Sequence, residues 1–143
     1  MNREKLMEIA ALFAFEGEVE SVSQLGEGFI NDTYIVHTAG SAPTYILQRK
    51  NHYVFPDVPR MMENIAAVTS HIKGKVAEPM RQTLTVIPAR DGKLYAEVEG
   101  NFWAACLYIE GSQCYDRADS LELARQGGAG IGRFQTLLAD FTT

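Results

Sequence analysis

The sequence predicts an α+β protein: an antiparallel sheet of five to six strands, one helix packed on it, and a further helix near each end of the chain. Three observations support this class. A hairpin with a glycine-rich connection spans about residues 19–37, an amphipathic segment spans 58–73, and three strand-like runs separated by turns span 83–109.

The composition is that of a globular protein. The chain has 143 residues, of which 46% are hydrophobic and 22% charged, and no apolar run reaches the roughly 20 residues of a membrane span. The net charge of -5 disfavours nonspecific nucleic-acid binding. The N-terminus mixes both signs of charge, unlike a secretory signal, and Cys106 and Cys114 lack metal-site spacing. We therefore expect a cytoplasmic protein with no nucleic-acid partner and no membrane partner.

The first elements are a helix and a hairpin. Leu6, Ile9 and Phe13 recur at helical spacing, which predicts a helix over 3–15 that ends at Gly17. Runs rich in β-branched residues at 19–25 and 33–37 predict two strands.

The connection between these strands contains two glycines one residue apart, Gly26 and Gly28. Two interpretations are open. The loop is an ordinary hairpin turn, or its backbone N–H groups approach the phosphate oxygens of a ligand, since glycine has no Cβ to keep the backbone away.

A third strand is predicted over 44–50, where Tyr45, Leu47 and Arg49 share one face by the period of two. Arg49 is either a surface charge at the strand end or a cation on an otherwise inward face.

A helix is predicted from about 58 to 73, with Asp57 as the N-cap, Pro59 in the first turn and Gly74 at its end. Glu63 lies away from the centre of the apolar stripe of this helix. It is either a solvated helical residue or, if the helix packs beside the third strand, an ion-pair partner for Arg49.

The second half predicts strands at 83–87, 94–98 and 102–109, and then a helix that begins near Asp119. The glycine-rich run 127–132 lies within this helix. A dinucleotide-binding motif requires a preceding strand, so close helix packing through small residues is the better interpretation.

This order of elements resembles the small lobe of the protein-kinase-like fold. More closely, the chain resembles the N-acetylhexosamine 1-kinases of the aminoglycoside and choline phosphotransferase group. The resemblance runs from about residue 15 to 141 and rests on the segments 31–34, 45–49, 62–65, 109–112 and 132–135.

The resemblance implies a role for each site residue. Gly26, Gly28 and Asn31 would belong to the loop over the ATP phosphates, with Asn31 standing where protein kinases have a third glycine. Arg49 would pair with phosphate, and Glu63 would be its helix partner. Backbone groups of Leu107, Tyr108 and Ile109 would hydrogen-bond adenine at the hinge.

The resemblance also implies that half of the enzyme lies elsewhere. Phosphoryl transfer in this fold needs a catalytic-loop Asp and Mg²⁺ ligands, and none is identifiable here, so we expect no catalytic and no metal residue in this chain. The cofactors of the parent enzyme would be ATP and Mg²⁺. The expected domains are a nucleotide-binding small lobe with its N-terminal helix (1–111) and a linker with the first helix toward a large lobe (112–143).

Several expectations follow for function. The parent would phosphorylate the anomeric hydroxyl of an N-acetylhexosamine, whereas this chain alone should be inactive. A kinase acting on choline, homoserine or an aminoglycoside is the alternative, and a non-catalytic interaction module is another. The expected partners are a nucleotide, a small-molecule sugar and the large lobe of the same parent. Apolar surface left by that lobe predicts self-association or partly disordered C-terminal residues.

Overall fold

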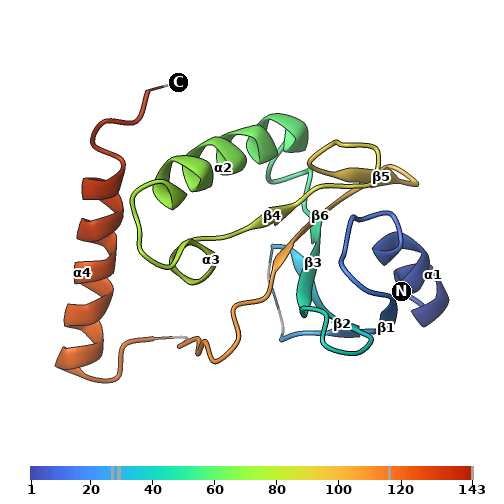
Figure 1. Cartoon of the computed structure of the whole chain (residues 1–143), viewed down its shortest axis with the longest axis horizontal. Coiled ribbons are helices and arrows are strands. Elements are labelled where there is room, and N and C mark those ends of the chain that lie inside the picture. Colours follow the sequence, from blue (N-terminus) through green and yellow to red (C-terminus); the bar gives the residue numbers. More distant parts are fainter. Residues whose placement is uncertain (27, 29, 116, 143) are drawn as a thin grey trace.

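A computed structural model describes residues 1–26, 28, 30–115 and 117–142. It contains a six-stranded antiparallel sheet in the order β1-β2-β3-β6-β4, with β5 paired to β6 (Figure 1). The expected α+β class is confirmed. The strands are β1 (Val19–Gln24), β2 (Asp32–Thr38), β3 (Tyr45–Lys50), β4 (Val86–Ile87), β5 (Ala96–Val98) and β6 (Asn101–Leu107).

Helix α1 (Arg3–Ala10) covers one face of the sheet. The Asn2 side chain caps it by accepting a hydrogen bond from the Lys5 N–H. The predicted extension to residue 15 is wrong. The chain leaves the helix because Phe13 forms a β-bridge with Ala89, which draws this segment onto the edge of the sheet.

The main hydrophobic core lies between α1 and this face. Leu47 and Trp103 are fully buried there, and the aromatic rings of Phe15 and Tyr45 stack 4.3 Å apart. Packing in this core turns the face of β3 that carries Tyr45 and Leu47 toward α1.

Helix α2 (Val58–Lys73) has the predicted bounds and covers the opposite face. Asp57 caps it, accepting from the Arg60 N–H at 3.1 Å, and Gly74 follows its last residue. Val58 and Met62 are buried against Ala104 of β6, in a second, smaller core. The sheet therefore has a different helix on each face.

The meander is shorter than predicted. Only Val86 and Ile87 form β4, and it is preceded by a short helix that was not predicted, α3 (Pro79–Gln82). Pro79 has no backbone N–H to lose in the first turn of a helix, which was the available sequence signal.

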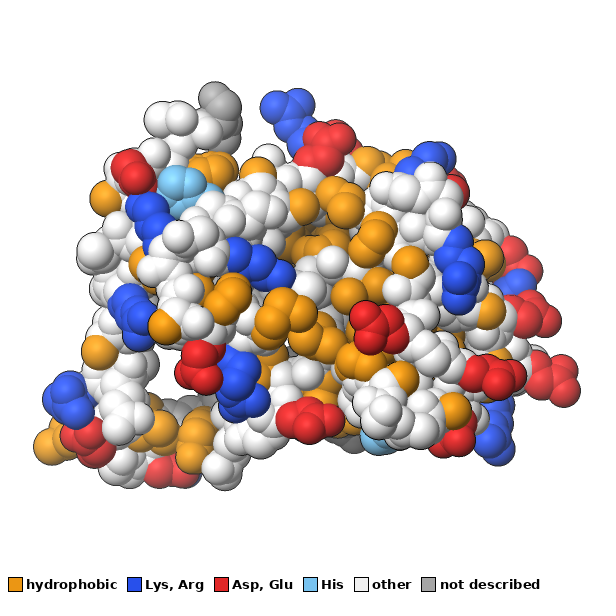
Figure 2. All heavy atoms as spheres, in the orientation of Figure 1, with side chains coloured by type: hydrophobic (Ala, Val, Ile, Leu, Met, Phe, Trp, Pro, Cys, Tyr) orange, Lys and Arg blue, Asp and Glu red, His pale blue; other side chains and the backbone are white. Residues whose placement is uncertain are grey.

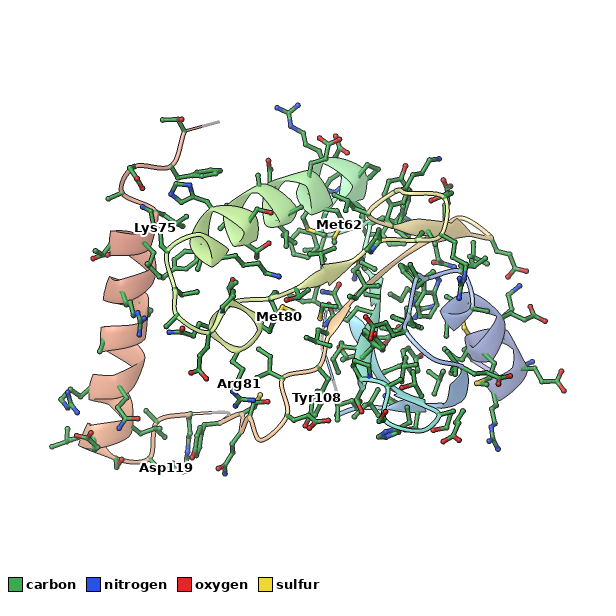
Figure 3. The ribbon with its side chains drawn as sticks, viewed as in Figure 1. Met62, Lys75, Met80, Arg81, Tyr108 and Asp119 are labelled. Carbon is green, nitrogen blue, oxygen red and sulfur yellow. The ribbon has the colours of Figure 1, made fainter. Side chains whose placement is uncertain are left out.

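Helix α4 (Leu121–Leu137) begins one residue later than predicted, with Ser120 as its N-cap. None of its residues is buried. Its C-terminal end lies near the end of α2 (Figure 1), close to Lys75 (Figure 3). Asp140, just beyond α4, pairs there with His71 and Lys75. Hydrogen bonds from Lys75 and His71 lower the pKa of Asp140 to about 2, and the hydrogen bond from Lys75 is the larger cause.

The glycine-rich run lies inside α4, as predicted, but its proposed role in close packing is not seen. A Cβ added at Gly127, Gly128, Gly130 or Gly132 would meet nothing within 4 Å. No helix in the described part of the chain is both long and apolar enough to cross a membrane.

Candidate functional site

The glycine-rich loop connects β1 to β2. Gly26 has a φ of 67°, in the left-handed region that other residues rarely adopt. A Cβ at Gly28 would overlap the backbone carbonyl of Asn31. Glu27 and Phe29 lie outside the described residues. The backbone alone therefore requires glycine at both predicted positions.

A polar cavity of about 290 Å³ lies beside this loop, where β3 ends and β6 begins. Asn31 braces the adjoining segment, because its side-chain oxygen accepts a hydrogen bond from the Asn51 N–H at 2.9 Å. Three basic side chains and one carboxylate line the cavity. Its lining residues are Ile30, Asp32, Arg49, Lys50, Asn51, His52, Tyr53 and Asn101.

Arg49 lines this cavity, but its partner is not the predicted one. Arg49 and Asp32 are opposite each other in the β2–β3 register, and the guanidinium donates to the Asp32 carboxylate. Glu63 is exposed, forms no ion pair with any described residue, and lines a different cavity beside Lys93 and Tyr95.

The register explains why the Arg49–Glu63 pair is absent. Arg49 shares a face of β3 with Leu47 and Tyr45, so it belongs to the face that α1 covers, whereas Glu63 comes from the helix on the opposite face. The sheet itself separates the two side chains. The predicted ion pair is therefore corrected to Arg49–Asp32.

Lys50 is the site residue that the sequence analysis missed. It lies opposite Phe102 in the β3–β6 register, on the α2 side of the sheet, and its Nζ donates to Gln48 Oε1 at 2.6 Å. Burial lowers the pKa of Lys50, and the nearby Cys106 thiol offsets part of that effect. The alternation along 45–50 was the available signal, since it places Arg49 and Lys50 on opposite faces.

The predicted adenine-binding edge is only partly available. The Leu107 N–H donates to Thr85 O at 2.9 Å, and the Tyr108 N–H donates to Thr44 O at 3.0 Å. The Ile109 N–H has no hydrogen-bond partner among the described residues. A base at this edge could therefore receive a backbone hydrogen bond from Ile109, but not from the other two N–H groups without breaking existing bonds.

A larger, mostly apolar cavity of about 520 Å³ lies between α2, α3, the segment after β6 and α4. On the face of the molecule shown in Figure 2, hydrophobic side chains gather in the middle, between α4 and the sheet. Arg81 points toward the segment that carries Tyr108 (Figure 3) and donates to the Glu110 carbonyl at 2.8 Å. The lining residues are Asn64, Ile65, Val68, Thr69, Ile72, Arg81, Gln82, Thr83, Leu84, Ile109 and Phe134.

Within the described residues, no group of three or more His, Cys, Asp or Glu side chains is arranged to hold a metal ion.

The sheet order, with α2 on one face and a glycine-rich connection between β1 and β2, is the arrangement that the sequence resemblance implies, the small lobe of a phosphotransferase. A sequence model of this class matches residues 21–143, and the chain belongs to APH, the phosphotransferase enzyme family.

Among solved structures, the chain is similar to spectinomycin phosphotransferase APH(9)-Ia, in complex with ADP and spectinomycin. The TM-score is 0.66 at 10% sequence identity, and the match covers 100% of this chain and 39% of that chain. At this identity the likeness concerns the fold. The expected kinase-like superfamily is confirmed.

Proposed function

We propose that this chain is the ATP-binding small lobe of a small-molecule phosphotransferase. The observation that carries the proposal is the polar cavity beside the glycine-rich loop, lined by Arg49, Lys50 and His52. Basic side chains next to a loop with close backbone approach suit a polyphosphate. Gly26, Gly28 and Asn31 would form the cover of this site.

In this proposal the base lies at the edge after β6, where the Ile109 N–H offers a donor. Leu107 and Tyr108 would contribute their side chains and carbonyls, because their N–H groups are engaged within the sheet. Glu63 would act indirectly, since it lies on the far side of the sheet from Arg49.

The remainder of the proposal concerns the parent enzyme. Its large lobe would follow the linker and helix of 112–143, and would supply the catalytic Asp and the Mg²⁺ ligands. The chain spans only 39% of the length of the spectinomycin enzyme, which supports a partner lobe of this kind. The two free cysteines favour a reducing compartment such as the cytoplasm.

The proposed substrate is an N-acetylhexosamine, phosphorylated at its anomeric hydroxyl, and this rests on the sequence resemblance. The alternatives are choline, homoserine or aminoglycoside substrates, and a non-catalytic interaction module. Phosphoryl transfer by the parent enzyme to a panel of these compounds distinguishes the substrate classes.

The test of the nucleotide site is direct binding of ATP to the 143-residue chain by isothermal titration calorimetry. Arg49→Ala and Lys50→Ala should each weaken binding by about tenfold or more, because each removes a charged hydrogen-bond donor. Arg117→Ala is the matched control, since its side chain is 87% exposed and pairs with Asp119 in the linker. Absence of ATP binding by the wild-type chain, or unchanged binding by both cavity variants, would overturn the proposal.

A further inference from the structure

A row of polar side chains crosses β2 and β3 on the face that α2 covers. Thr33 lies opposite Gln48 in the β2–β3 register, and Gln48 lies opposite Ala104 in the β3–β6 register. Lys50 is two residues beyond Gln48 and belongs to the same face. Ala104 packs against α2, so the row faces that helix rather than α1.

The three side chains form one continuous chain of hydrogen bonds. Lys50 Nζ donates to Gln48 Oε1 at 2.6 Å, and Gln48 Nε2 donates to Thr33 Oγ1 at 2.9 Å. Every side chain in the row is partly buried. Gln48 thus uses its carbonyl for the ammonium and its amide for the hydroxyl, which fixes the orientation of its side chain.

The charge of Lys50 is uncompensated, in contrast to that of its neighbour. Arg49 is neutralised by Asp32, whereas Lys50 forms no ion pair with any described carboxylate. A neutral amide holds the ammonium in place without cancelling its charge. Because a partly buried ammonium is costly to leave unpaired, the position favours an external anion.

We propose that Gln48 and Thr33 are positioning residues that hold Lys50 as the anion-binding ammonium of this site, in place of a helix carboxylate. The inference rests on the proposed nucleotide-binding function and adds to it. It assigns a phosphate-facing role to Lys50, held by a neutral hydrogen-bonded row, beside Arg49, which is paired with Asp32.

The first test measures ATP affinity of the 143-residue chain by calorimetry for Thr33→Val and Gln48→Leu. Thr33→Val removes one hydrogen bond of the row and Gln48→Leu removes both, and each nearly preserves side-chain volume, so each should weaken binding by about 3- to 10-fold. Thr38→Val is the matched control. It removes a hydroxyl from the other end of β2, where Thr38 donates to Pro43 O at 2.6 Å, and its affinity should equal that of the wild type.

The second test needs no nucleotide and measures the pKa of the Lys50 amine by NMR titration of its Cε signal. Gln48 Oε1 accepts from the charged ammonium and so favours that form. Gln48→Leu should therefore lower the pKa of Lys50 below its wild-type value, and Gln48→Glu should raise it.

The outcomes distinguish failure of the positioning role from failure of the proposed nucleotide-binding function. If the wild-type chain binds no ATP, the proposed function fails, and the titration alone decides whether the row positions Lys50. If Lys50→Ala weakens binding but Thr33→Val and Gln48→Leu do not, the nucleotide site stands and the positioning role is overturned. An unchanged pKa of Lys50 in Gln48→Leu would overturn it as well.

Discussion

At the scale of single residues, Leu47 shows how one side chain couples the core to the site. It is fully buried between α1 and the sheet and lies two residues before Arg49 on the same strand. Its packing fixes which face of β3 turns inward. The direction of Arg49 and Lys50 follows from that choice, because strand side chains alternate.

Leu47→Ala should therefore lower the free energy of unfolding by about 2–5 kcal/mol, through lost burial and a residual cavity. Chemical denaturation followed by circular dichroism measures this change. Leu121→Ala removes the same atoms from a side chain that is 91% exposed, and should change stability little. Equal effects of the two substitutions would contradict the core described here.

The site residues were predictable from sequence to different degrees. Gly26 and Gly28 could be located, because two glycines between two strand-like runs are visible in the sequence. The partner of Arg49 could not, because Asp32 meets it only through the β2–β3 register. The hydrogen bonds that occupy the Leu107 and Tyr108 N–H groups likewise depend on neighbouring chain segments.

At the scale of elements, α4 is a helix whose sequence disfavours it. Four glycines lie within it, and each costs about 1 kcal/mol relative to alanine in a helix interior. Their positions are open, so alanine would meet no neighbour. Capping by Ser120 and the attachment of Asp140 to the end of α2 hold the two ends of the helix.

Gly128→Ala should stabilise α4 by about 1 kcal/mol, through reduced backbone entropy in the unfolded chain. Amide hydrogen exchange within 121–137 measures the local stability. The adjacent Ala129→Gly is the reciprocal control and should destabilise the helix by a similar amount. A loss of protection in Gly128→Ala would instead indicate that this surface is closely packed in solution, as the sequence analysis first proposed.

At the scale of the whole molecule, the apolar surface of α4 is left uncovered. The sheet carries α1 on one face and α2 on the other, and α4 stands to one side, beside the end of α2 (Figure 1). Apolar side chains of α4 are exposed. Ile131 is 64% exposed and Phe134 is 49% exposed. Phe134 also lines the large apolar cavity, so the exposed helix and the cavity form one apolar region.

We expect this surface to cause self-association of the 143-residue chain, because monomers rarely expose apolar patches of such extent. Sedimentation velocity should show a weight-average coefficient that rises with protein concentration. The double variant Ile131→Ser, Phe134→Ser should reduce that dependence, whereas Gln135→Ser on the same helix should not. A concentration-independent monomer would refute the expectation.

The sequence by itself determined the fold class and most of the secondary-structure elements, though not the short helix α3 or the exact ends of α1 and β4. A period of two marks the strands, and helical spacing with Asp57 and Gly74 at its ends marks α2 within its observed bounds. These are local properties, set by the backbone and by neighbours a few residues away. The tertiary structure alone decided which face of β3 meets which helix. Alternation separates Arg49 from Lys50, but only the packing of α1 and α2 shows that Arg49 belongs to the α1 face and Lys50 to the α2 face, because that choice depends on contacts between segments distant in the chain.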